Sequence, residues 1–303
     1  MAKQHRVASD VKEQIFKSQR SLEVLRFGIP PGCSLSWYNC VNPMLSARRK
    51  SDGQLVSAYF ATKTAGKFVC DVCNEEVILK TGRNRIDHFA HASPIACKLA
   101  SGESEEHRRC KLDIFRALQE VPGVREIALE RPIGNVRPDV SAEINGTHVA
   151  IEVQISSLSI ETIMARTIEY AREGKYVLWL LQWSPTLDAA RYAPKPWERW
   201  LHAAYFGRVY YWVEGLTVVS YHFDPHFRTV TRKTWYSEEG KKLTGGGYSR
   251  RSKRFRTPVR GEAFNLATDF KPRNRYWWAT KSLKLPDAKL FMDVRASEIN
   301  REN

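Results

Sequence analysis

Acidic side chains and a strong turn signal occur together in residues 137–156, RPDVSAEINGTHVAIEVQIS. The Asn-Gly pair at 145–146 favours a two-residue type I′ turn, which requires positive φ at both positions. A regular hairpin around this turn places Asp139 opposite Glu152, with Cβ atoms about 4.5–5.5 Å apart. Gln154 shares their face, since side chains alternate along a strand, and the alternate residues are apolar. The pattern therefore predicts a core face and a face that carries two carboxylates and an amide.

Two carboxylates that face each other repel unless a cation lies between them. The hard cation Mg²⁺ is held by one or two carboxylates, with water and substrate phosphate completing its shell. We therefore predict that Asp139 and Glu152 bind Mg²⁺ or Mn²⁺. The alternative is an exposed acidic pair on an edge hairpin.

Cysteines and histidines with metal-ligand spacing lie further upstream. Cys70 and Cys73 form a Cys-x2-Cys pair, and His88 and His91 follow after fourteen residues. Two thiolates and two imidazoles complete a tetrahedral zinc site if a helical turn brings both histidines to one side. The histidines stand closer together than in zinc fingers, and Cys97 is a rival fourth ligand. We expect a structural zinc that holds a small module together, the alternative being buried thiols.

The composition is that of a globular, strongly basic chain. Its 303 residues carry a net charge of +15, and 43% of them are hydrophobic, which allows one large domain or two small ones. The charge predicts a polyanionic partner, with nucleic acid ranked before an anionic membrane. No apolar run approaches a membrane span of ~18 residues, and the N-terminus lacks the apolar stretch of a signal peptide. We therefore expect a cytoplasmic protein without a membrane partner, whose cysteines are thiols or metal ligands.

The elements that must position these residues alternate between helices and strands. We expect a helix opened by a capping serine and closed by the Pro-Gly pair at 122–123. A strand over 124–133 and the Asn-Gly hairpin follow, and after them a helix over 159–174 and a buried strand over 175–183. This order predicts an α/β fold with a mixed central sheet.

The helix before the hairpin carries a further candidate group. Glu103, His107 and Lys111 fall at i, i+4 and i+8, and they form one stripe if the helix begins by Glu103. The alternative is a solvated helix start, in which acidic residues complement the helix dipole.

Taken in order, these motifs resemble those of the competence protein CoiA-like nuclease family, part of the PD-(D/E)xK nuclease superfamily. The segments that carry the resemblance are Cys-x2-Cys at 70–73, HFAH at 88–91, ESEEHRRCK at 103–111, RPD at 137–139, IEVQ at 151–154 and ARTIEYAREGKYVLWLL at 165–181. The likeness implies a PD-(D/E)xK restriction-endonuclease-like core with a mixed central sheet, preceded by a small zinc-binding module. It also implies metal-dependent nuclease activity linked to DNA uptake and recombination.

The resemblance implies a role for each candidate residue. Asp139 and Glu152 would bind the catalytic metal, and Glu103 would be the helix carboxylate. Gln154 stands where the superfamily usually has lysine, and an amide cannot carry charge or act as a base. It could still orient the attacking water or coordinate through its carbonyl. Lys111 is a candidate for the missing positive charge beside the phosphate.

Further along the chain, cationic residues are candidates for DNA contact. Arg166 and Tyr170 lie on one helix face and would contact backbone phosphate, the alternative being an ordinary helix surface. Residues 241–260 contain eight Lys or Arg and no acid, and their glycines suggest a mobile loop in which Tyr248 and Phe255 stack on bases. The cations expected to bind DNA there are Arg250, Arg251, Lys253, Arg254 and Arg256. The alternative is a solvated basic loop that aids solubility.

These expectations divide the chain into parts with different roles. The parts are an N-terminal extension (1–42), a β-hairpin plus zinc-binding module (43–100), a PD-(D/E)xK nuclease-like domain (101–225) and a basic C-terminal region (226–303).

We predict a Mg²⁺- or Mn²⁺-dependent deoxyribonuclease that hydrolyses phosphodiester bonds in single- or double-stranded DNA. It would act in DNA uptake and recombination or in phage defence, with recombination or defence proteins as candidate partners. No Gly-x4-Gly-Lys-Ser/Thr loop is present, so we expect no use of ATP. One alternative is a catalytically silent DNA-binding recombination factor with a nuclease-like fold, and another is a scaffold that recruits partners through its Trp-rich C-terminal half.

Overall fold

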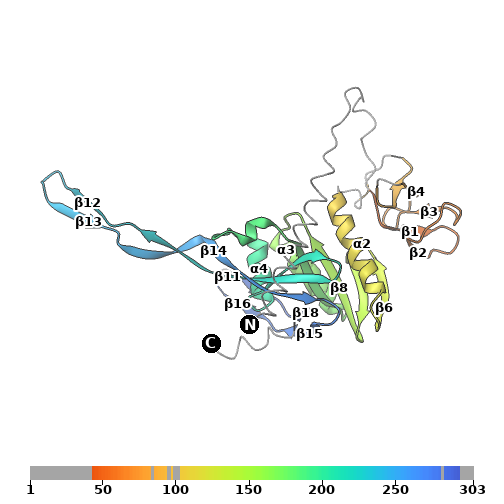
Figure 1. The fold of residues 1–303 in the computed structure, drawn as a ribbon. Helices are drawn as coiled ribbons and strands as arrows, with labels where there is room; N and C mark the ends of the chain where they lie inside the picture. Colours follow the sequence, from red (N-terminus) through yellow and green to blue (C-terminus); the bar gives the residue numbers. More distant parts are fainter. Residues whose placement is uncertain (1–42, 83–84, 94–96, 98–102, 281–282, 294–303) are drawn as a thin grey trace, which may run out of the picture. The chain divides into compact units, whose positions relative to one another are not determined.

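The computed structural model describes residues 43–82, 85–93, 97, 103–280 and 283–293 (Figure 1). The predicted N-terminal extension, residues 1–42, lies outside the described residues. By their contacts, all described residues belong to one unit, Asn42–Asn303.

A small antiparallel sheet is formed by the first described residues, and we call this sheet with its loops the β1–β5 module. Its strands, in the order β2-β1-β3-β4-β5, are β1 (Ser46–Arg49), β2 (Leu55–Ser57), β3 (Phe68–Val69), β4 (Glu76–Lys80) and β5 (His88–His91). The turn between β1 and β2 passes through Gly53 at φ +69°, a backbone conformation that favours glycine. Phe68 and Phe89 pack together in its core, with ring centroids 4.8 Å apart.

A mixed sheet of nine strands is the largest sheet among the described residues. Its strands are β6 (Val124–Leu129), β7 (Val140–Ile144), β8 (Thr147–Gln154), β9 (Tyr176–Gln182), β10 (Val209–Glu214), β11 (Thr217–Val230), β14 (Tyr248–Asn265), β15 (Phe270–Arg275) and β18 (Ala288–Asp293). Seven of them follow the order β14-β11-β10-β9-β8-β7-β6, while β18 pairs with both β9 and β15. β9 runs parallel to β8, β10 and β18, and the other neighbours are antiparallel. The predicted α/β fold with a mixed sheet is therefore confirmed.

The described part of the chain has three α-helices, which are α2 (Glu105–Gln119), α3 (Ile160–Arg172) and α4 (Pro196–Ala204), and a short 3-10 helix, η3 (Pro185–Asp188). Serines cap the first two: the hydroxyl of Ser104 accepts from the N–H of His107, and that of Ser159 accepts from the N–H of Thr162. The apolar face of α2 packs into the core with Leu112, Ile114, Phe115 and Leu118. No helix among the described residues is long and apolar enough to cross a lipid bilayer.

The hairpin that carries the candidate acidic pair has the predicted register. β7 and β8 pair Val140 with Ile151, which places Asp139 and Glu152 at the next position of the same register. Both residues of the turn at 145–146 have positive φ, 48° and 77°, as a type I′ turn requires. The alternate, apolar set is buried, so the predicted core face is confirmed.

The C-terminal strands differ from expectation. β11 continues past residue 225, and β14, β15 and β18 join the same sheet as β6–β10. The prediction of a mobile loop over residues 241–260 is wrong, because this stretch forms β13 (Lys242–Gly245) and much of β14. Gly246 and Gly247, at φ +89° and +79°, turn the chain between these strands. The remaining strands are β12 (Lys233–Tyr236), which pairs with β13, and β16 (Trp278–Ala279), which pairs with β17 (Lys284–Leu285).

Candidate active site and metal centre

A cavity of about 810 Å³ contains the candidate catalytic residues. It lies where the open end of the β7–β8 hairpin meets the start of α2 and a side chain from α3. All the residues predicted for the catalytic site line it: Glu103, Lys111, Asp139, Glu152 and Gln154. The fold therefore brings together side chains from positions as distant in sequence as 103 and 154.

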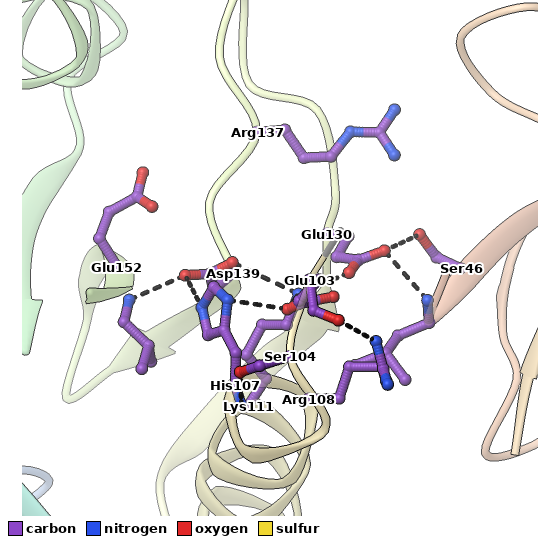
Figure 2. Close-up of polar contacts among 12 residues, drawn as sticks. Ser46, Glu103, Ser104, His107, Arg108, Lys111, Glu130, Arg137, Asp139 and Glu152 are labelled. Atoms are coloured by element: carbon purple, nitrogen blue, oxygen red, sulfur yellow. Dashed lines mark hydrogen bonds and ion pairs between the residues drawn. The ribbon is translucent and has the colours of Figure 1, made fainter. Parts of the chain in front are cut away.

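Three donors surround Asp139 (Figure 2). Its Oδ2 accepts hydrogen bonds from the backbone N–H of Val153 at 2.8 Å and from Nε2 of His107 at 3.1 Å. The Nζ of Lys111 lies 3.4 Å from its Oδ1. Burial opposes ionisation of Asp139, but Lys111 and His107 outweigh burial and lower its pKa to about 2. Asp139 is therefore a carboxylate at neutral pH.

Two cations from α2 lie among the carboxylates. The buried Nζ of Lys111 lies 2.5 Å from Oε1 of Glu103 and 2.7 Å from Oε1 of Glu130. Burial lowers the pKa of Lys111, but these carboxylates outweigh it and raise that pKa above its ordinary value. His107 Nδ1 lies 3.0 Å from Oε1 of Glu103. Burial also opposes the charge on His107, but its bonds to Asp139 and Glu103 raise its pKa to about 9, so both α2 side chains are cationic at neutral pH.

Glu103 lies just before α2 rather than on it. Ser104 caps the helix, and the first helical residue is Glu105. The predicted helical stripe therefore does not extend back to Glu103, but its carboxylate still reaches His107 and Lys111 from the residue before the extended Ser104 cap.

The carboxylate of Glu152 points away from Asp139 (Figure 2). Its Oε1 accepts hydrogen bonds from Nε of Arg166 at 3.0 Å and from the hydroxyl of Tyr170. Burial raises the pKa of Glu152 to about 7, with a further contribution from the charge of Asp139 and an opposing one from Arg166. The two predicted metal ligands thus line one cavity, but each has cationic or hydroxyl partners of its own.

Arg166 and Tyr170, predicted to contact phosphate, both contact Glu152 in this structure. Tyr170 is fully buried, so its hydroxyl is not open to a phosphate. Arg166 lines the cavity, and its Nη2 also donates to the backbone carbonyl of Arg137 at 2.8 Å. Of this pair, Arg166 alone faces the cavity.

Gln154 is fixed at the cavity wall by the residue two positions on. Its Nε2 donates to the backbone carbonyl of Ser156 and lies 3.3 Å from the Ser156 hydroxyl. The amide supplies no charge, and the ammonium beside Asp139 is that of Lys111.

The donor set of the cavity fits a hard divalent cation. Asp139 and Glu152 present carboxylate oxygens, which Mg²⁺ prefers, and Glu103 adds a third carboxylate. Ligand atoms of Glu103 and Asp139 lie within 4.8 Å of each other, and the cationic His107 bridges them in this structure. Glu152 is bound by Arg166 instead, so its oxygens would have to leave the guanidinium to join a cation beside Asp139.

A second group of ligand atoms lies in the β1–β5 module. Cys70, Cys73, His91 and Cys97 each offer one ligand atom, and these atoms lie within 4.8 Å of one another. The Sγ atoms of Cys70 and Cys97 are 3.8 Å apart, and Cys73 Sγ is 3.1 Å from Nε2 of His91. Zinc–sulfur bonds of about 2.3 Å in a tetrahedron put sulfurs about 3.8 Å apart. The group is a candidate Cys3His metal site whose donors fit zinc.

His88 stands outside this group, where sequence spacing had predicted it as a ligand. The helical turn expected at residues 88–91 is wrong, because HFAH forms strand β5. Side chains three positions apart on a strand point to opposite faces. His91 therefore reaches the cysteines, whereas Nδ1 of His88 lies 2.7 Å from the carbonyl of Ile86. Cys97, the rival ligand, completes the group.

Two buried acids that sequence patterns did not single out connect the β1–β5 module to the cavity. The Nζ of Lys111 donates to Oε1 of Glu130, and Oε2 of Glu130 accepts from the Ser46 hydroxyl at 3.2 Å (Figure 2). Asp71, between the two cysteines, forms ion pairs with Arg48 and Arg137. The only sequence signals were an acid inside Cys-x2-Cys and an acid at a strand end, and both patterns are common on protein surfaces.

The basic residues of 241–260 that were predicted to bind DNA belong to one strand outside the cavity. Arg250, Arg251, Lys253, Arg254 and Arg256 all lie on β14. Tyr248 is exposed at the start of this strand, and the guanidinium of Arg254 lies over the ring of Phe255 at 5.3 Å.

Two stretches of the chain are similar to known protein families. The family model described as "Competence protein CoiA, nuclease-like domain" matches residues 103–192, and "Competence protein CoiA, N-terminal domain" matches residues 54–100. Competence protein CoiA of Bacillus subtilis (strain 168) is 29% identical over 126 residues, which are 39% of this chain and 32% of that protein. The matched part thus spans about a third of the relative's length, and no solved structure gives a significant match. The candidate catalytic residues all lie within the nuclease-like match, and residues 54–100 and 103–192 of this chain are thus similar to the two domains of the competence protein CoiA family.

Proposed function

We propose that this protein is a divalent-metal-dependent nuclease of the PD-(D/E)xK type, which hydrolyses phosphodiester bonds in DNA during DNA uptake and recombination. The observation that carries this proposal is the shared cavity, in which Asp139, Glu152 and Gln154 from the hairpin meet Glu103, just before α2, and Lys111 on α2. The family's nuclease-like domain and the net charge of +15 support a polyanionic substrate.

Asp139 and Glu152 would hold the divalent cation, with Glu103 as the third carboxylate. A cation bound there supplies a water of lowered pKa and stabilises the charge that develops on the phosphate. The negative charge of Asp139 is ready at neutral pH, because its pKa is about 2. Glu152, whose pKa is about 7, is the ligand whose ionisation sets the site's charge.

Lys111 would supply the positive charge that Gln154 cannot carry. Glu103 and Glu130 fix its ammonium from two sides, at 2.5 and 2.7 Å, and leave it 3.4 Å from Asp139. A preorganised cation of this kind stabilises developing negative charge without reorganisation during the reaction. Gln154 would orient the attacking water by hydrogen bonding alone.

Arg166 would exchange one partner for another when substrate binds. In this structure it balances Glu152 and donates to the carbonyl of Arg137. With Glu152 holding a cation, the guanidinium would keep the Arg137 carbonyl as a partner and its free N–H groups would bind a backbone phosphate. For the Cys3His group we propose a structural zinc that stabilises the β1–β5 module.

The test is cleavage of labelled single- and double-stranded DNA with Mg²⁺, Mn²⁺ or EDTA. Asp139→Asn and Glu152→Gln keep side-chain shape and remove one charge each, and both should lower metal-dependent cleavage by at least about a hundredfold. Glu143→Gln is the matched control, because Glu143 lies on β7 but pairs with the exposed Arg125, and it should cut like wild type. Circular dichroism and zinc content establish that each variant is folded.

Cutting that survives in both variants would contradict the proposal. DNA binding without cutting under any metal would favour the catalytically silent recombination factor. Two observations support this alternative: Arg166 neutralises the charge of Glu152, and Gln154 stands where the superfamily usually has lysine.

A further inference from the structure

Strands β11 and β14 continue beyond their neighbours as a two-stranded ribbon (Figure 1). β10 pairs with β11 only as far as Tyr221, whereas β11 and β14 stay paired from His222 to Val230. We call residues 222–260, with β12 and β13 at the tip, the arm. Near its base, Tyr192 and Arg256 exchange both backbone hydrogen bonds, each 2.8 Å long.

Strand pairing and a required glycine fix the conformation of the arm. Beyond the paired end of β11, β12 and β13 pair Trp235 with Leu243. Gly246 turns the chain back at φ +89°, and a Cβ added there would lie 2.2 Å from the carbonyl oxygen of Thr231. Glycine is therefore required at this turn, and a mobile linker would have no such requirement.

Charge is concentrated on the arm and is not neutralised there. The arm has eleven Lys or Arg and three Asp or Glu, a net charge of +8 out of the chain's +15. Arg228 stands directly opposite Arg250 in the ladder, and like charges at such positions repel. Burial, Arg199 and Arg251 all lower the pKa of Arg256. Within the described residues, neither Arg228 nor Arg250 has a carboxylate partner, and the same holds for Arg251 and Arg256.

Both faces of the ribbon carry cations and exposed rings. Arg228 and Arg250 point to one face, and the next residue of the ladder, Arg251, points to the other beside Phe227. Phe227 is 59% exposed, and Tyr248 is 54% exposed. A soluble ribbon that folds for its own stability gains nothing from exposed rings between unpaired arginines, so these side chains are arranged for a partner.

We infer that the arm binds duplex DNA by entering its major groove. That groove admits a two-stranded β-ribbon, and a row of phosphates runs along each of its sides. Cations on both faces of the ribbon then each meet a phosphate row, and the repulsion between Arg228 and Arg250 is relieved. Extended residues rise about 3.3 Å each, so the nine arm residues of β11 reach about 30 Å, enough to cross a groove about 12 Å wide. Single-stranded DNA has one phosphate row and would use one face.

This inference rests on the proposed function for the identity of the polyanion as DNA, but it does not require cleavage. The test is therefore binding measured in EDTA by fluorescence anisotropy, with a duplex and a single strand of the same sequence. The arm variant is Arg228→Gln/Arg250→Gln/Arg251→Gln, whose positions are all exposed. The control Arg109→Gln/Arg172→Gln/Lys271→Gln removes the same charge from exposed positions outside the arm.

The arm variant should bind the duplex at least tenfold more weakly at moderate salt. Its slope of log affinity against log salt should become shallower by about 2.7, since each lost phosphate contact on B-DNA contributes ~0.9. The control should lose less than threefold. Equal losses in the two variants, or a loss confined to single-stranded DNA, would overturn the inference.

Chemical footprinting tests the groove. Dimethyl sulfate methylates guanine N7 in the major groove and adenine N3 in the minor groove. Wild type should protect guanine N7 and the arm variant should not, whereas protection of adenine N3 alone would overturn the inference. An arm variant that binds weakly while wild type never cuts would support the arm and defeat the nuclease. Cleavage that is lost in Asp139→Asn, together with an unaltered duplex affinity of the arm variant, would support the nuclease and overturn the inference about the arm.

Discussion

Asp71 and Arg137 form an ion pair that joins the cysteine group to the hairpin of the candidate active site. Asp71 lies between Cys70 and Cys73, and its side chain is only 5% exposed. Arg137 precedes Asp139 by two residues, and its backbone carbonyl accepts from Arg166. A continuous path therefore runs from the β1–β5 module through Arg137 and Arg166 to Glu152. Through it, the module helps to position Arg166, the partner of one of the proposed metal ligands.

Asp71→Asn should lower cleavage without loss of the bound metal at the cysteines. The substitution leaves the partly buried Arg137 with a neutral, weaker partner, so the end of the hairpin should move. A move that raises the activation free energy by about 1.4 kcal/mol lowers the cleavage rate about tenfold. Steady-state kinetics with zinc content measured on the same sample would show this. Asp52→Asn, which breaks an exposed pair with Arg49, is the control and should have wild-type activity. Unchanged activity in Asp71→Asn would show that the module does not position the site.

The zinc content of single variants should show which histidine of the HFAH segment, His88 or His91, is a metal ligand. His91→Ala and Cys97→Ala each remove a ligand atom from the group, so both should lose zinc and destabilise the β1–β5 module. His88→Ala should retain it, because His88 lies on the opposite face of β5. The measurement is metal stoichiometry by plasma mass spectrometry after dialysis. Retention by Cys97→Ala together with loss by His88→Ala would restore the Cys2His2 set that spacing alone suggests.

Local chemistry explains what the sequence could predict. The Asn-Gly turn fixes the register of β7 and β8 without reference to the remaining chain, so the positions of Asp139 and Glu152 followed from it. Capping serines and stop signals placed α2 and α3 in the same way. By contrast, HFAH is too short for its periodicity to distinguish a helical turn from a strand, and the ligand assignment of His88 depended on that choice.

Contacts between distant segments explain what it could not predict. Glu130 meets Ser46 across 84 positions and Lys111 across 19, and no spacing rule relates these residues. The spacing of Arg166 and Tyr170 predicted that they share a helix face, but packing of α3 determines that this face meets Glu152. A glycine-rich stretch such as 241–260 is compatible with a mobile loop and with a ribbon turn. The pairing of β14 with β11, which its composition does not reveal, makes it a ribbon.

Cleavage at limiting Mg²⁺ should rise with pH through about 7. Burial raises the pKa of Glu152 to about 7, so below that pH the proposed ligand is protonated and cannot bind a cation well. Saturating Mg²⁺ favours the ionised form and should move the midpoint to lower pH. Cleavage rates from pH 5.5 to 8.5 at low and high Mg²⁺ would check this. A midpoint that ignores Mg²⁺ concentration would mean that Glu152 is not the titrating ligand.

Acid should destabilise the base of the arm through His202. Its Nε2 accepts the backbone N–H of Phe223 at 3.1 Å, so that nitrogen cannot carry a proton in the folded state. Burial, with smaller contributions from the neighbouring His222 and Arg256, lowers the pKa of His202 from 6.5 to about 4. Between pH 6.5 and 4 the unfolded chain binds a proton that the folded chain does not. Stability therefore rises with pH across this window and is lost as pH falls through it.

His202→Gln separates this effect from other acid-sensitive groups, because its amide oxygen can still accept from Phe223 but does not titrate. Melting temperatures at pH 7.5 and 5.0, measured by circular dichroism, should fall further in wild type than in His202→Gln. His148→Gln, at an exposed histidine 44% accessible on β8, should show the wild-type difference. An equal pH effect in wild type and His202→Gln would place the titrating group elsewhere. A smaller effect in the variant would make His202 a pH-sensitive anchor of β11 where the arm begins, and duplex binding by the arm should then weaken in acid along with it.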